Sequence, residues 1–201
     1  MDMERLYKKG LFLEYFTVGY NIVEAVVSIV FGRLANSIAL FGFGLDSIVE
    51  SLSGLVLIWR LRKHGKITEE EEERIEKRAM RFVALTFFLL GLYVLFESLR
   101  KMFGGDIPEP SLPGIVIALV SIIVMPLLTW QKYQTGKAIG SRALMADAKE
   151  TLACSFLSVA LLLGLGGNYL FHFWQADPLA GLVIVAFLFK EGWESWDESS
   201  E

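Results

Sequence analysis

Six long apolar segments constrain this chain more than any other feature, because each is long enough to cross a lipid bilayer. A membrane-spanning helix needs about 20 mostly apolar residues. Of the 201 residues, 54% are hydrophobic. We therefore expect an all-α membrane protein in which residues 1–201 form a single transmembrane domain, with no soluble domain. The six transmembrane helices are expected at about 10–31, 35–60, 79–102, 112–132, 141–166 and 177–194.

Lysine and arginine residues are distributed unevenly between the two sides of these expected helices. If the N-terminus is cytoplasmic, the outer segments contain only Arg33, Arg100 and Lys101, whereas the inner segments contain most of the other basic residues. Basic residues accumulate on the cytoplasmic side of membrane proteins. We therefore expect both termini in the cytoplasm, in a multi-pass protein of the plasma membrane.

Ionisable residues inside an apolar span are energetically costly, and they indicate either a functional site or a structural pair. The second segment contains Asp46 and Glu50, which are four residues apart and therefore share one face of a helix. Two further segments carry polar residues at helical spacing: Asp147, Glu150, Thr151 and Cys154 in the fifth, and Glu14, Asn21, Glu24 and Ser28 in the first.

The depth of these residues can be estimated by counting along the antiparallel second and fifth helices. Asp46 is roughly 16 Å below the outer end of the second helix, at a rise of about 1.5 Å per residue. The same count places Cys154 level with Asp46 and Glu150 level with Glu50. Carboxylate oxygens and one thiolate suit a divalent transition metal. The sequence therefore predicts a four-ligand metal site made of Asp46, Glu50, Glu150 and Cys154.

Each of these residues also has a structural interpretation. Asp46 and Glu50 could form a buried structural pair with Lys149 as the counter-ion. Cys154 could be a small apolar core residue. Asp147 could cap a helix or form a pair near the cytoplasmic mouth, and Glu24 together with Asn21 could be an interhelical hydrogen-bond pair. The residues that we consider as additional metal or proton-coupling groups are Asp147, Glu24, Asn21, Thr151 and Lys149.

Composition excludes several other classes of protein. The single cysteine leaves no intramolecular disulfide and no multi-cysteine zinc module. The net charge of −4 argues against a generic nucleic-acid surface. The residues show no arrangement typical of a catalytic nucleophile and no nucleotide-binding loop, so we do not expect an enzyme or a permanently bound cofactor.

The site-bearing stretches resemble those of the cation diffusion facilitator family of divalent-metal/proton antiporters. The matching stretches are ANSIALFGFGLDSIVESLSG in the second segment, SRALMADAKETLACSFLS in the fifth and ADPLAGLVIVAFLF in the sixth. The resemblance implies a six-helix membrane domain, a homodimer, and one metal site between the second and fifth helices. It also implies alternating access driven by proton exchange.

The sequence departs from this family pattern in two ways. Zinc-carrying relatives typically have a His and an Asp four residues apart in the fifth helix, where this chain has Glu150 and Cys154. The cytoplasmic ferredoxin-like domain that is usual in the family is also expected to be absent. The resemblance therefore indicates a carrier for zinc, iron, cobalt, manganese or cadmium, without deciding between them.

The function expected from the sequence is export of a divalent cation from the cytoplasm in exchange for protons. Three carboxylates and a thiol at close range cannot all stay ionised, so an empty site should hold protons that an arriving cation displaces. The alternatives are a membrane scaffold or partner subunit that transports nothing, and an exporter of small organic molecules.

Overall fold

The computed structural model describes residues 3–63, 68–104 and 107–199, and this part of the chain contains six helices and no strand. The helices are α1 (Met3–Leu34), α2 (Ile38–Lys63), α3 (Glu69–Gly104), α4 (Leu112–Ile139), α5 (Arg142–Phe171) and α6 (Ala176–Glu198). The prediction of an all-α protein with six helices is confirmed.

Helices such as α1 and α4 are longer than predicted, because polar residues beyond the apolar segments continue them. In α1, the ion pair between Lys8 and Glu4, at 2.6 Å and one turn apart, lies in the early turns that the apolar pattern did not include. The helix α4 begins after the N-cap residue Ser111 and ends at Gly140, which adopts a left-handed conformation with φ 70°. It therefore passes beyond Lys132, where the apolar segment was predicted to end.

Five of the helices, α1 to α5, contain stretches that are long and apolar enough to cross a membrane. The helix α6 has 23 residues, but Asp177, Lys190 and Glu191 interrupt its apolar sequence. It is nevertheless integrated in the bundle, because it packs along α3 and α5 and also contacts α2.

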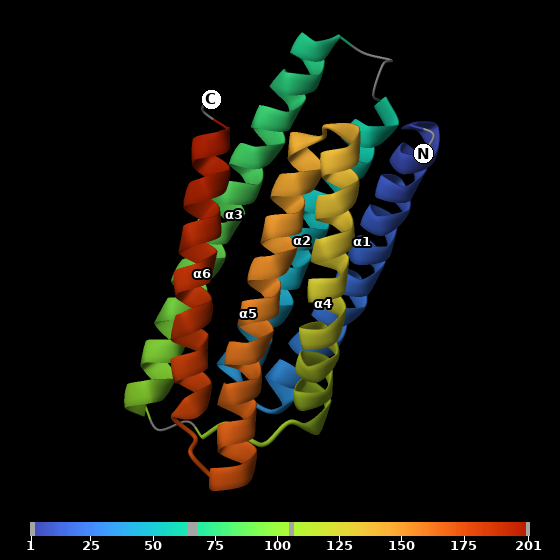
Figure 1. Ribbon diagram of the computed structural model, residues 1–201. Coiled ribbons are helices and arrows are strands. Elements are labelled where there is room, and N and C mark those ends of the chain that lie inside the picture. The colour runs from blue at the N-terminus through green and yellow to red at the C-terminus, as the bar shows by residue number, and fades with distance from the viewer. Residues whose placement is uncertain (1–2, 64–67, 105–106, 200–201) are drawn as a thin grey trace.

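The helices alternate in direction and form an antiparallel bundle, so that the N- and C-terminal ends lie at the same end of the molecule (Figure 1). The most extensive contacts join α1 with α2, α4 with α5, and α3 with α6, the last pair being distant in sequence. Two termini at the same end of the bundle are expected of a chain that crosses the membrane an even number of times. The assignment of this end to the cytoplasm remains a prediction from the basic residues.

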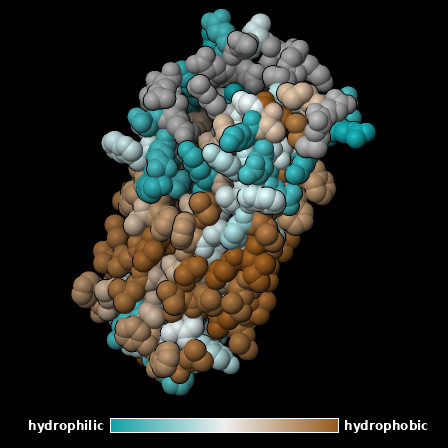
Figure 2. Space-filling model, in the orientation of Figure 1, coloured by the Kyte–Doolittle hydropathy of each residue, from teal (hydrophilic) through white to brown (hydrophobic). Residues whose placement is uncertain are grey.

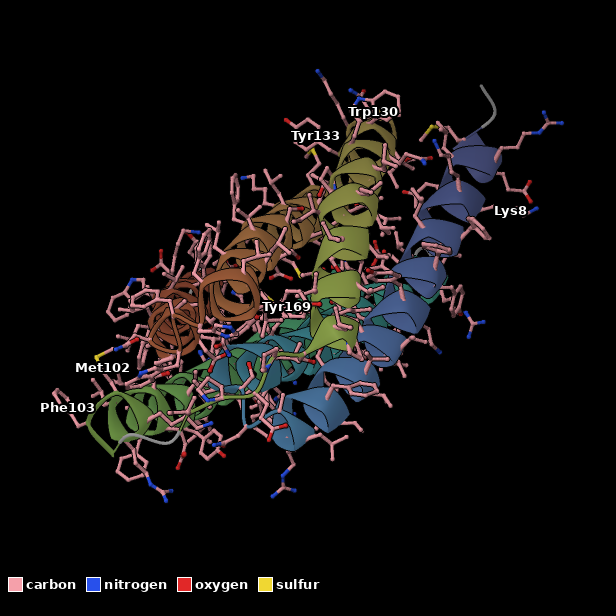
Figure 3. The ribbon with its side chains drawn as sticks, turned by 90° about the horizontal axis from the view of Figure 1, so that it is seen from below. Lys8, Met102, Phe103, Trp130, Tyr133 and Tyr169 are labelled. Atoms are coloured by element: carbon pink, nitrogen blue, oxygen red, sulfur yellow. The ribbon has the colours of Figure 1, made fainter. Side chains whose placement is uncertain are left out.

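The polarity of the surface changes along the length of the bundle. Figure 2 shows a broad apolar band over the middle and lower part, whereas polar residues gather at the end that holds the termini. In Figure 3, Trp130 and Tyr133 lie on the outer side of α4, and their side chains are 65% and 43% exposed. Large exposed aromatic residues on an apolar band are expected where a bundle faces lipid.

Small residues let α2 pack closely against its neighbour α1. A side chain at Gly44 would come within 2.8 Å of Ile29 and 2.9 Å of Ser28, both on α1. Close approach of this kind is typical of helices that associate inside a bilayer. It holds α1 and α2 as one unit, from which α2 presents its acidic residues to α5.

Candidate metal centre

The four residues predicted as ligands line one narrow recess between α2 and α5. Asp46 and Glu50 come from α2, and Glu150 and Cys154 come from α5. Asp46, Glu50 and Cys154 are buried, with 7%, 5% and 2% exposure, whereas Glu150 is partly exposed. Phe87 of α3 and Glu191 of α6 complete the polar and aromatic lining. We call this feature the α2–α5 recess.

Hydrogen bonds hold one carboxylate oxygen of Glu50 and one of Glu150. The Thr151 hydroxyl donates to Glu50 Oε1 at 3.0 Å, and the Ser53 hydroxyl donates to Glu150 Oε2 at 3.0 Å. Each bond joins α2 to α5. The second oxygen of Glu50, Oε2, is buried and accepts no hydrogen bond from the residues that the structure describes.

The recess is not a closed coordination shell in this conformation. Among the described residues, no group of three or more His, Cys, Asp or Glu side chains is gathered closely enough to hold a metal ion. The recess therefore contains carboxylates and a thiol of the kinds that bind metals. These side chains would have to move closer together to bind a cation. The assignment of the four ligands stays a prediction.

The buried positive charge near the recess is Lys132, and the expectation that Lys149 fills this role is corrected. Lys149 is exposed and lines a polar pocket between α5 and α6. The side chain of Lys132, from α4, has no exposed surface. Its ammonium forms ion pairs with Asp147 of α5 and with Glu14 of α1, the latter at 3.2 Å, and donates to Thr151 Oγ1 at 3.2 Å.

The other candidate residues are also placed by the structure. Asp147 forms a buried ion pair, as one of its two interpretations proposed, and its partner is Lys132. Of the two residues considered for interhelical hydrogen bonds, Glu24 forms them: it accepts from Ser47 of α2, at 2.7 Å, and from Ser121 of α4. The side-chain amide of Asn21 is buried and has no hydrogen-bond partner among the described residues.

Sequence reasoning missed two residues near the recess. Lys132 was counted as a basic residue of a cytoplasmic segment, although its position at the end of an apolar run was a signal of partial burial. Glu191 lies one residue after Lys190 at the end of the sixth apolar segment and reaches the recess from α6. Because only Lys190 separates Glu191 from the apolar run, Glu191 could have been considered with the other intramembrane acids.

Two openings near the end of the bundle that holds the chain termini share a lining residue with the recess. One lies among α2, α3 and α5 and is lined by residues that include Ser53, Arg60 and Asp147. The other lies between α5 and α6 and is lined by residues that include Lys149 and Glu194. Glu150 lines both openings and the recess, so it lies where the three spaces meet.

Hydrogen bonds join helix ends at the opposite end of the bundle, where a further pocket is lined by residues that include Asn36, Ser37 and Lys101. Asp177, at the start of α6, accepts hydrogen bonds from the Ser37 hydroxyl and from the Ile38 backbone N–H, the latter at 2.9 Å. Lys101, near the end of α3, donates to the Asn36 side chain at 2.7 Å and to its backbone carbonyl. These contacts tie α6 and α3 to the turn between α1 and α2.

Comparison with known proteins identifies a family and several relatives. Residues 15–201 match the profile of the family described as the cation efflux transmembrane domain. The chain is similar to the manganese efflux system protein MneS of Bacillus subtilis strain 168, with 23% identity over 197 residues that cover 96% of this chain and 68% of the relative.

Two further curated relatives show the range of similar proteins. Transmembrane protein 163 of Xenopus laevis is 22% identical over 186 residues, which cover 92% of this chain and 65% of the relative. The magnetosome protein MamB of Magnetospira sp. strain QH-2 is 27% identical over 178 residues, which cover 87% of this chain and 60% of the relative. The chain thus spans 60–68% of the length of these three relatives.

Proposed function

Because the chain belongs to the cation efflux family, we propose that it exports a divalent transition-metal cation from the cytoplasm in exchange for protons. Transport proceeds by alternating access at the α2–α5 recess. The observation that carries this proposal is that Asp46, Glu50, Glu150 and Cys154, from two antiparallel helices, line one buried recess. Carboxylate oxygens and a thiolate together suit a divalent transition metal.

The donor set bears on which cation is carried. Carboxylates favour hard ions such as Mn²⁺, whereas a thiolate favours softer ions such as Zn²⁺. One relative is named for manganese efflux. The three carboxylates of Asp46, Glu50 and Glu150 against the single thiol of Cys154 support manganese, iron or cobalt at least as well as zinc or cadmium.

The openings of the bundle support alternating access. Both openings reach Glu150 from the end that holds the termini, whereas Asp177 and Lys101 tie the helices together at the other end. The pocket at that other end, lined by residues that include Asn36 and Lys101, shares no lining residue with the recess. With the termini in the cytoplasm, this conformation therefore gives access to Glu150 from the inside. Release of the cation outside then requires the contacts of Asp177 and Lys101 to break and the inner openings to close.

Proton exchange follows from the charges in the recess. Asp46, Glu50, Glu150 and Glu191 share a small buried space, and like charges at such range cannot all remain ionised. A cation binds deprotonated ligands, so its arrival releases protons. The recess then carries protons in the direction opposite to the metal.

The assembly and location of the protein complete the proposal. As the sequence resemblance implies, the protein works as a homodimer in the plasma membrane. The broad apolar band of Figure 2 can accommodate both the lipid and a second copy of the chain.

Transport by purified protein in proteoliposomes tests the proposal. Uptake of Mn²⁺, Fe²⁺, Co²⁺, Zn²⁺ and Cd²⁺ is measured separately under an imposed pH gradient. We expect a pH-dependent flux of at least one ion that Asp46→Ala abolishes, because Asp46 is a proposed ligand. The matched control is Glu4→Ala, which removes an acid from the exposed Lys8 pair on α1 and should leave the flux unchanged.

Equal fluxes in the native protein and in Asp46→Ala would contradict the site. A metal flux that ignores the pH gradient would contradict proton exchange and leave a uniporter or a channel. Flux of none of these ions would contradict metal transport. Thermal unfolding of each variant in detergent verifies that a lost flux does not reflect a lost fold.

A further inference from the structure

The buried ammonium of Lys132 is connected to the metal recess through a single side chain. Lys132 Nζ donates to Thr151 Oγ1 at 3.2 Å, and Thr151 Oγ1 lies 3.0 Å from Glu50 Oε1. All three side chains are buried, and they come from α4, α5 and α2. The only residue between the lysine and the proposed ligand is therefore Thr151.

The direction of the Thr151 hydroxyl follows from the number of its protons. A hydroxyl group has one proton and two acceptor lone pairs. Lys132 is a donor only, so it occupies a lone pair of Thr151. The single proton can go to Glu50 Oε1 or to the Asp147 carbonyl at 3.1 Å, and a carboxylate is the stronger acceptor. The bonds then run in one direction, from Lys132 through Thr151 to Glu50.

This arrangement leaves the two oxygens of Glu50 in different situations. Oε1 is held by Thr151, whereas Oε2 is buried without a hydrogen bond from any described residue. A buried acceptor without a partner is unfavourable. A cation in the recess would supply the missing partner, because Glu50 lines the recess together with Asp46 and Cys154.

We propose that Lys132 is a positioning residue of the metal site, which acts through Thr151 to hold Glu50 so that Oε2 alone faces the cation. The inference rests on the proposed function, since it concerns the same recess. It adds that Glu50 binds through one oxygen, and that α4 contributes to metal affinity although it supplies no ligand.

Calorimetric titration of the purified full chain with Mn²⁺, and separately with Zn²⁺, tests this connection. Thr151→Val keeps the shape of the side chain and removes the hydroxyl, whereas Thr151→Ser keeps the hydroxyl. Loss of a residue that orients a metal ligand weakens metal binding by about 10- to 100-fold. We expect a loss of that size in Thr151→Val and affinity within about threefold of the native value in Thr151→Ser, on the same principle.

Two further variants separate positioning from packing. Ser158→Ala removes another buried hydroxyl of α5, which donates only to its own helix at Cys154 O, and it should bind metal like the native chain. Lys132→Met should weaken binding less than Thr151→Val does, because it also removes a positive charge near the recess. The loss caused by Thr151→Val should be smaller in the Lys132→Met variant than in the native chain, because the two residues act in series.

The outcomes distinguish this inference from the proposed function. Native affinity in Thr151→Val, or equal losses in Thr151→Val and Thr151→Ser, would overturn the positioning role while metal binding by the native chain still stood. Additive losses in the double variant of Lys132→Met and Thr151→Val would also overturn it. If the native chain binds neither ion, both the inference and the proposed function fail.

Discussion

Replacing Lys132 by Met should destabilise the folded protein by about 3–5 kcal/mol, the usual cost of removing one partner from a buried ion pair. The burial and the contacts of Lys132 lead to a loss of stability of the same size. The side chains of Lys132 and Glu14 are fully buried, and that of Asp147 is 6% exposed. The substitution leaves both carboxylates without their charged donor, and each such hydrogen bond is worth about 1.5–3 kcal/mol.

Equilibrium unfolding of the purified protein in detergent, at about pH 8, measures this loss. The matched control is the triple variant Lys132→Met, Glu14→Met and Asp147→Leu, in which no buried charge remains. Replacement of a whole buried charge cluster by apolar residues of similar volume is often nearly neutral. The triple variant should therefore recover most of the stability that Lys132→Met loses. The reasoning is refuted if Lys132→Met unfolds like the native chain at pH 8, or if the triple variant is as unstable as the single one.

Two predictions concern the recess itself. Cys154→Ser should shift metal preference towards Mn²⁺ and away from Zn²⁺ and Cd²⁺ in the proteoliposome assay, because a hydroxyl is a harder ligand than a thiolate; unchanged selectivity would remove Cys154 from the ligand set. Metal affinity should weaken as the pH falls from about 7.5 to about 6, and calorimetry in two buffers of different ionisation enthalpy should count the released protons; binding without proton release would contradict the exchange.

The sequence predicted the elements and the shared face of the recess because both depend on local patterns. Apolar length determined the six helices, and the spacing of Asp46 and Glu50 placed them on one side of α2. Counting residues along two antiparallel helices then matched them with Glu150 and Cys154, and the structure brings these four residues to one recess. The limits of the helices were less accurate, because capping residues such as Gly140 decide where a helix ends.

The counter-ion could not be predicted from the same patterns. Lys149 is adjacent to Glu150 in sequence, but successive residues of a helix differ by about 100° in direction, so Lys149 faces away from the recess. Lys132 lies at the end of an apolar run, and from this position in the sequence it is expected at the membrane surface. Its burial depends on Glu14 of α1 and Asp147 of α5, which only the packing of three helices brings to it.

A positive charge so close to a site for dications would oppose binding if it were isolated. Lys132 is paired with two carboxylates, Glu14 and Asp147, so this group carries a net charge of about −1 when all three are ionised. The group therefore attracts an approaching cation while its ammonium still donates to Thr151. This explains how one lysine can orient Glu50 without repelling the metal, and it requires that the three charges be kept together. Removal of either acid alone should leave Lys132 less well compensated and make the recess less attractive to a dication.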